Sequence, residues 1–131
     1  MTITLDASAG LEIVLKREKA IHFREMLSNA KKVYSSDLYK VETANAIWKY
    51  VRSGFIPKEI AIDLLHLALD LVDDYQDISD YNVEALQEAI ILNHSVYDML
   101  YLSLARRTAS ILLSTDKRLL ELAKQQGLQT N

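Results

Sequence analysis

The chain contains no cysteine among its 131 residues. Disulfide bonds, zinc–thiolate sites and thiol nucleophiles are therefore excluded. It also has only one proline and three glycines, so long coil linkers are not expected. The glycines are too few and too widely spread for a phosphate-binding loop or a dinucleotide-binding fingerprint.

Long apolar runs are also missing. None approaches the ~18 residues that a membrane-spanning helix needs. The apolar first 15 residues are interrupted by Asp6 and Glu12, and no basic region precedes them as in a signal peptide. We therefore expect a soluble, cytoplasmic protein without a membrane partner.

The chain also lacks an excess of basic residues. The formal net charge is −3, which argues against a general nucleic-acid coat protein. It does not exclude an enzyme that reaches phosphate through a bound metal ion. Half of the residues are apolar and a quarter are charged, as in ordinary globular proteins. The length suits a single domain over residues 1–131.

Short β-branched and apolar runs alternate with longer stretches of helical periodicity. This alternation predicts a three-layer α/β/α sandwich with a short, mainly parallel central sheet. Gly54 and Gly127 follow expected helix ends, and Pro57 precedes an expected helix start. Strands are expected at 2–5, 32–35, 76–78 and 110–113, with a further edge strand at 128–130, and helices from 7 onward and at 18–30, 38–53, 58–74, 82–93, 96–107 and 116–126.

Four acidic residues fall at strand ends or helix beginnings. Asp6 ends the first strand, Asp116 follows the buried 111–113 run, and Asp98 and Glu42 lie in early turns of helices. In parallel α/β sheets, ligands bind beyond the carboxyl ends of the strands, so these acids should share one edge. Positive helix N-termini partly offset the negative charge gathered there.

Carboxylates brought together repel one another, and cations bound between them remove the repulsion. Oxygen ligands favour magnesium or manganese over zinc or copper. Two such ions ~4 Å apart can activate water and stabilise the leaving oxygen of a phosphodiester. Metal ions would also supply the positive charge that this acidic chain lacks.

The four acids lie in segments that together resemble the motifs of PIN domains. The order, the spacing and the chain length all match, over essentially the whole chain. The resemblance is strongest to the toxin component of VapBC toxin–antitoxin pairs. The segments are Leu5-Asp6-Ala7-Ser8, Val41-Glu42-Thr43-Ala44-Asn45-Ala46, the run from Val96 to Ala105 around Asp98, and the run from Leu113 to Leu119 around Asp116.

This resemblance implies a Mg²⁺- or Mn²⁺-dependent endoribonuclease that acts as a toxin on translation and growth. It also implies a homodimer and inhibition by a small VapB-like antitoxin. Asp6, Glu42, Asp98 and Asp116 carry over as catalytic residues, with Asp6, Asp98 and Asp116 as metal ligands. Ser8 and Thr115 take supporting positions, and Asn45, three residues after Glu42 on the same helix face, could orient it by hydrogen bonding.

Each acid taken alone is more simply a turn residue, a helix-start charge or part of a solvated face. Two alternatives to the nuclease stay open, a non-catalytic PIN-like module that binds RNA or protein and a metal-dependent DNA nuclease. Of the aromatic residues near the 38–74 helices, we expect about half to pack in the core and the rest to form an exposed groove for an antitoxin helix. The three histidines, His22, His66 and His94, have no ligand-pair spacing and are interpreted as incidental.

Overall fold

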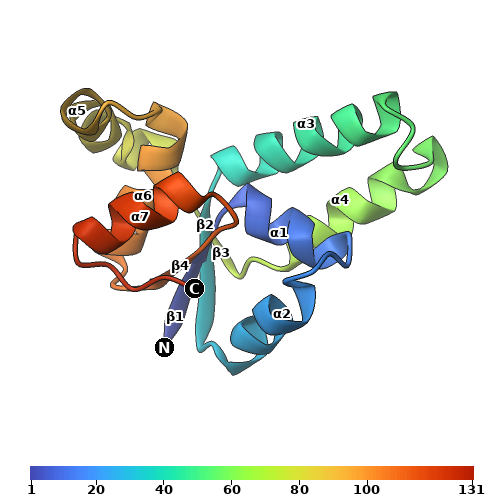
Figure 1. The fold of residues 1–131 in the computed structure, drawn as a ribbon, viewed down its shortest axis with the longest axis horizontal. Helices are drawn as coiled ribbons and strands as arrows, with labels where there is room; N and C mark the ends of the chain where they lie inside the picture. Colours follow the sequence, from blue (N-terminus) through green and yellow to red (C-terminus); the bar gives the residue numbers. More distant parts are fainter.

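The computed structural model describes residues 1–131 and contains a four-stranded sheet (Figure 1). The strand order is β3-β2-β1-β4, and every neighbouring pair is parallel. The predicted α/β fold with a mainly parallel sheet is therefore confirmed. The strands are β1 (Thr2–Leu5), β2 (Lys32–Ser36), β3 (Asp74–Gln76) and β4 (Ile111–Leu113).

Helices cover both faces of the sheet. Figure 1 views the sheet nearly edge-on, with α5 and α6 on one side and α1 to α4 on the other. No helix combines the length and the apolar character that crossing a membrane would require. The helices are α1 (Ala7–Val14), α2 (Ala20–Asn29), α3 (Leu38–Arg52), α4 (Ala61–Asp70), α5 (Asn82–Leu92), α6 (Val96–Arg107) and α7 (Lys117–Gln125), with 3₁₀ turns at Lys58–Ile60 and Ile78–Asp80.

The central strands are apolar on both faces because helices bury both. Ile3 and Leu5 of β1 and Leu112 and Leu113 of β4 have no exposed surface. Near-continuous apolar runs of this kind are typical of parallel strands covered on both sides. The buried polar exception in β1 is Thr4, whose hydroxyl is hydrogen-bonded to that of Ser110 at 2.6 Å.

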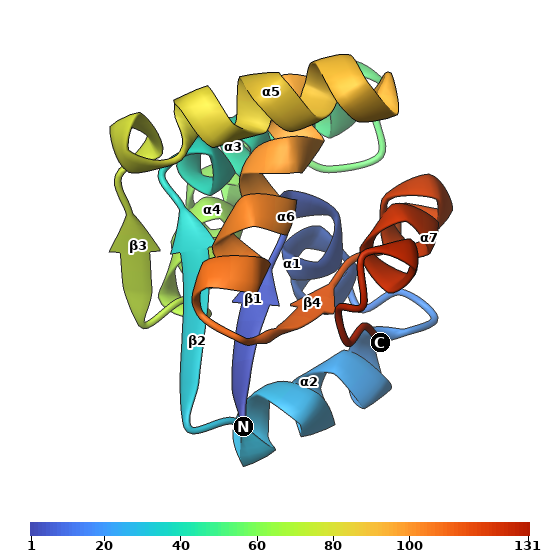
Figure 2. The ribbon, with the colours of Figure 1, turned by 90° about the vertical axis from the view of Figure 1, so that its left-hand side faces the viewer.

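All strands point toward the same edge of the sheet, and α5 runs across that edge (Figure 2). Asp6 directly follows β1, and Ser114 directly follows β4. The backbone N–H of Asp6 donates to the carbonyl of Leu113, so the two strand ends are held side by side. Two of the four segments predicted to carry the site, those of Asp6 and Asp116, therefore meet at this edge.

Several element boundaries differ from the prediction, and those of α4 and β3 have a clear cause. Helix α4 ends at Asp70 rather than at residue 74, and β3 covers Asp74–Gln76 rather than 76–78. The cause is Asp73, whose backbone N–H donates to the carbonyl of Val33 and whose carboxylate accepts from the N–H of Val33 at 2.8 Å. These bonds draw the chain onto β2 two residues early. The expected edge strand at 128–130 is reduced to one bridge between Leu112 and Thr130.

Gly10 allows α1 to lie directly against the buried Tyr39 of α3. A Cβ atom at position 10 would overlap the Tyr39 hydroxyl. That hydroxyl donates a 2.6 Å hydrogen bond to the carbonyl of Ala68, which joins α3 to α4. The absence of a side chain on Gly10 therefore sets how closely three helices pack.

We expect Gly10→Ala to destabilise the protein by about 2–3 kcal/mol, because the added methyl group displaces Tyr39 and its buried hydrogen bond. Urea unfolding of Gly10→Ala, Tyr39→Phe and the double variant measures the effect. The double variant should be less destabilised than the sum of the two single variants, since phenylalanine lacks the overlapping oxygen. Strictly additive losses would contradict the proposed contact.

Candidate active site

Asp6 is a buried carboxylate at the junction of β1 and α1, with only 4% of its surface exposed. It is the N-cap of α1, and its Oδ1 accepts hydrogen bonds from the Ala9 N–H at 2.9 Å and the Ser8 hydroxyl at 2.7 Å. Burial raises the pKa of Asp6 to about 6, although hydrogen bonds from Ser114, Ser8 and Ala9 oppose the rise. The fold therefore places a carboxylate where ionisation is costly without a nearby positive charge.

The loop after β4 is tied to Asp6 through hydroxyl groups. Ser8 Oγ accepts from the N–H of Thr115 at 2.9 Å, and Ser114 Oγ accepts from the N–H of Asp116 at 2.9 Å. Asp116 is the N-cap of α7, where Oδ1 accepts from the N–H groups of the next turn. Ser8 thus lies between Asp6 and this loop, whereas Thr115 contributes its backbone N–H and no side-chain hydrogen bond.

Asp98 lies in the first turn of α6 and is held by a histidine. Nε2 of His94 and Oδ2 of Asp98 are 2.7 Å apart. On the other side of the ring, Nε of Arg118 donates to His94 Nδ1 at 3.1 Å. Because a guanidinium nitrogen can only donate, Nδ1 is the acceptor and the ring proton lies on Nε2, directed at Asp98. Arg118, His94 and Asp98 form a hydrogen-bonded chain between α7 and α6.

The interpretation of His94 as incidental is therefore wrong. The prediction considered spacing between histidines only, whereas His94 and Asp98 have the (i, i+4) spacing that brings side chains together on a helix. Ser95, the N-cap of α6, lies between them, so the pairing crosses the start of the helix. The contact with Arg118 joins residues 24 positions apart, and no local pattern predicts it.

Glu42 approaches the same edge from α3. Its Oε1 accepts a 2.6 Å hydrogen bond from the hydroxyl of Tyr101, which lies one turn after Asp98 on α6. Burial raises the pKa of Glu42, with a further rise from the charge of Asp98. Asn45 makes no hydrogen bond to Glu42, so the expected orienting residue on α3 is replaced by Tyr101 from another helix.

The negative charge of Asp98 also raises the pKa of Asp6, so Asp6, Glu42 and Asp98 interact electrostatically. Asp98 also belongs to a second group, with His94 and Asp116, whose potential ligand atoms all lie within 4.8 Å of one another. Asp98 therefore connects all four predicted acids.

The donor set fits a divalent cation. Opposite ligands of Mg²⁺ or Mn²⁺ lie about 4 Å apart, so the carboxylates of Asp98 and Asp116 need only small movements to share one ion. Both ring nitrogens of His94 are already hydrogen-bonded, so His94 would hold Asp98 in place beside the ion. Carboxylate oxygens suit both ions. The group of possible ligands within 4.8 Å of one another consists of His94, Asp98 and Asp116. Asp6, a predicted ligand, is not in that group, but it is buried nearby, where the charge of Asp98 affects its pKa.

A parallel sheet with helices on both faces and a cluster of carboxylates at its carboxyl edge defines the PIN-like class of α/β folds. The family model for the PIN domain matches residues 3–125. The chain belongs to the PIN domain family, as its motifs predicted.

The relatives agree with this assignment. The chain is 29% identical over 126 residues to Ribonuclease VapC3 of Pyrobaculum aerophilum, covering 92% of this chain and 94% of that protein. The crystal structure of PAE2754 from the same organism matches with a TM-score of 0.74 and 25% identity, covering 99% and 92% of the two chains. VapBC2 from Rickettsia felis, solved with a DNA fragment from its promoter, shares the fold with a TM-score of 0.70 at 15% identity, over 100% and 98% of the chains.

The buried Asp6 predicts an unusual dependence of stability on pH in the metal-free protein. The native protein keeps this proton up to about pH 6, whereas an unfolded chain releases it near pH 3.8. Stability should therefore fall as pH rises from about 4 to 6 and stay lower above, by about 3 kcal/mol at most. Asp6→Asn should not show this fall, because the amide is neutral and keeps the oxygen that caps α1.

Urea unfolding in the presence of EDTA, from pH 4 to 8, measures both proteins. The difference between wild type and variant isolates Asp6, because all other titrating groups are shared. Asp6→Asn should gain stability relative to wild type as pH rises through this window. A difference that is the same at pH 4 and pH 7.5 would rule out the costly buried carboxylate.

Proposed function

We propose that this protein is a Mg²⁺- or Mn²⁺-dependent endoribonuclease and the toxin of a toxin–antitoxin pair. The observation that carries the proposal is the convergence of Asp6, Glu42 and Asp116 on Asp98 at the carboxyl edge of the sheet. The name of the relative Ribonuclease VapC3 supports RNA as the substrate.

Asp98 and Asp116 are the proposed carboxylate ligands, with Asp6 as a further ligand beside them. A bound divalent ion supplies positive charge for the phosphodiester and makes a water molecule more acidic. His94, fixed by Arg118, orients Asp98. Tyr101 fixes one oxygen of Glu42, which leaves the other to accept a proton from the attacking water.

Purified wild-type protein should cut cellular RNA into discrete fragments with Mg²⁺ or Mn²⁺ and not with EDTA. Asp98→Asn should lower the rate at least a hundredfold, because it removes the carboxylate shared by the whole cluster. The rates are compared on gels, with single-stranded DNA of matched length digested in parallel. Faster cleavage of DNA would favour the DNA-nuclease alternative.

Metal binding is measured separately by calorimetry with Mn²⁺. Asp98→Asn, Asp116→Asn and His94→Ala should each weaken binding tenfold or more. Lys49→Ala, an exposed change in the last turn of α3, serves as the control. If wild type binds Mn²⁺ but leaves RNA intact, the non-catalytic binding module becomes the better description.

We further propose that the antitoxin binds between α3 and α4. An entirely apolar groove of about 280 Å³ lies there, lined by residues that include Trp48 and Ile62. Trp48 is 53% exposed and Ile62 is 64% exposed, and a contiguous apolar surface of this kind is typical of an interaction site. A groove of this kind suits the apolar face of an amphipathic helix. Homodimer formation stays a prediction of the resemblance. A cytoplasmic location and a single domain over 1–131 stay predictions from the sequence.

Ile62→Glu should weaken binding of a cognate VapB-like antitoxin by tenfold or more, because it places a charge in the apolar groove. Calorimetry with the purified partner measures this loss, and the RNA cleavage rate of the free variant should equal that of wild type. Glu59→Gln, in the turn before α4, is the matched surface control. Unchanged affinity of Ile62→Glu would place the antitoxin elsewhere.

A further inference from the structure

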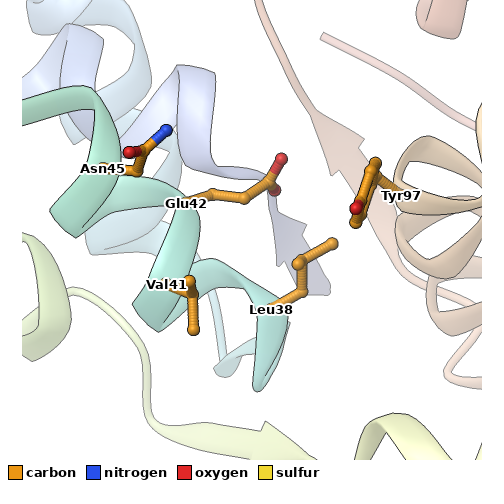
Figure 3. Close-up of a pocket in the computed structure, with 5 residues that line it drawn as sticks. All are labelled: Leu38, Val41, Glu42, Asn45 and Tyr97. Carbon is orange, nitrogen blue, oxygen red and sulfur yellow. The ribbon is translucent and has the colours of Figure 1, made fainter. Parts of the chain in front are cut away.

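A pocket of about 350 Å³ adjoins the acidic cluster and has no role in the function proposed above (Figure 3). Glu42 belongs both to this pocket and to the cluster. Tyr97 forms the opposite wall and directly precedes Asp98 in the chain. A nucleotide chain whose phosphate lies at the cluster would therefore have a neighbouring base within reach of this pocket. The lining residues are Leu38, Val41, Glu42, Asn45 and Tyr97.

Tyr97 differs from every other aromatic residue in the chain. Its side chain is 61% exposed, and it has no aromatic, cation–π or side-chain hydrogen-bond partner. Each of the other aromatic side chains has at least one such partner. Examples are Trp48, which lies beneath Arg52, and Tyr101, which is bonded to Glu42. The ring of Tyr97 is thus free to stack on a ligand.

The wall opposite Tyr97 carries aliphatic side chains beside polar ones. Figure 3 shows Leu38 and the carboxylate of Glu42 pointing from α3 toward the Tyr97 ring, across an open gap. Val41 adds a further aliphatic group and is 67% exposed. An aromatic ring facing aliphatic side chains forms a slot suited to a flat, uncharged ring.

The polar groups of the pocket favour a base over a phosphate. No lysine or arginine lines the pocket, and the Glu42 carboxylate would repel a phosphate. Asn45 lies one helical turn beyond Glu42, and its exposed amide has no hydrogen-bond partner in the structure. An amide offers both a donor and an acceptor, which is the combination that reads the edge of a base.

We propose that this pocket binds a nucleobase next to the scissile phosphate, with Tyr97 as the stacking surface and Asn45 as a hydrogen-bonding partner. The proposal rests on the nuclease function above and adds a determinant of where RNA is cut. Proteins commonly hold unstacked RNA bases on exposed aromatic side chains.

Binding is measured first, by fluorescence anisotropy with Ca²⁺ in place of Mg²⁺ or Mn²⁺, so that the carboxylates are neutralised. Gels run in parallel check that the octamers stay intact. The probes are fluorescein-labelled RNA octamers of adenylate and of uridylate, and an octamer of the same length that lacks its bases. Tyr97→Ala should weaken binding of at least one base-containing octamer about fivefold or more, while Tyr97→Phe keeps the stacking surface and stays near wild type. Phe55→Ala, which removes an exposed aromatic ring in the loop after α3, is the matched control.

The decisive comparison is how much the bases contribute to RNA binding by wild type and by Tyr97→Ala. Wild type should bind the abasic octamer several times more weakly than the base-containing one, and Tyr97→Ala should lose much of that difference. Asn45→Ala should alter the preference between adenylate and uridylate. Equal base dependence in wild type and Tyr97→Ala would overturn the proposal, as would a loss in antitoxin binding with no change in RNA binding. Because Tyr97 is exposed, its truncation should leave the core intact, and Tyr97→Leu provides a second variant that keeps an apolar side chain.

Cleavage assays separate this proposal from the nuclease function. If wild type cleaves RNA but Tyr97→Ala keeps the full difference in affinity between base-containing and abasic octamers, only the proposal of a base pocket is wrong. If Tyr97→Ala loses that difference in affinity but wild type does not cleave RNA, the base pocket is supported and the proposed nuclease function is wrong. Absence of both RNA binding and cleavage would overturn both.

Discussion

The buried carboxylate of Asp6 is the constraint around which the site is built. A carboxylate at the end of a central strand loses its hydration, and its pKa rises to about 6. The surrounding hydroxyl and N–H groups recover part of that loss and also fix neighbouring segments. The Ser8 hydroxyl is hydrogen-bonded both to Asp6 and to the loop after β4, so the group that holds Asp6 also positions the start of α7.

Asp98 extends this arrangement to the helices on the other side of the sheet. It interacts electrostatically with Asp6 and Glu42, and it is held by His94, which is in turn held by Arg118 from α7. The pKa values of Asp6 and Glu42 are raised chiefly by burial and further by the negative charge of Asp98. A divalent ion would relieve both effects, which is a physical reason for this acidic cluster to bind metal.

The same elements carry two surfaces of different character. Toward the sheet edge, α3 presents Glu42 beside the slot of Tyr97, and toward α4 it presents the apolar groove that includes Trp48. A half-polar slot beside an acidic cluster suits a flat base, whereas a wholly apolar groove suits a helix. In the functions proposed above, α3 would present one face to the RNA and another to the antitoxin.

Much of this structure follows from local sequence. The apolar runs, the helical periodicity and the helix-ending glycines predict the element order, and Val96–Arg107 forms a helix with the predicted bounds. The four acids were found because strand ends and helix starts are visible in sequence and parallel strands share an edge. The bounds of β3 could not be predicted from local sequence, because they depend on the hydrogen bonds between Asp73 and Val33, which is 40 residues away.

Tertiary structure alone decided which side chains complete the site. The sequence determined that carboxylates gather at one sheet edge, since that follows from strand order and the parallel topology. It could not show that His94 bonds Asp98 and Arg118, that Tyr101 rather than Asn45 holds Glu42, or that Tyr97 lacks a partner. Those contacts depend on how α3, α6 and α7 pack together, and packing between distant segments leaves no local pattern in the chain.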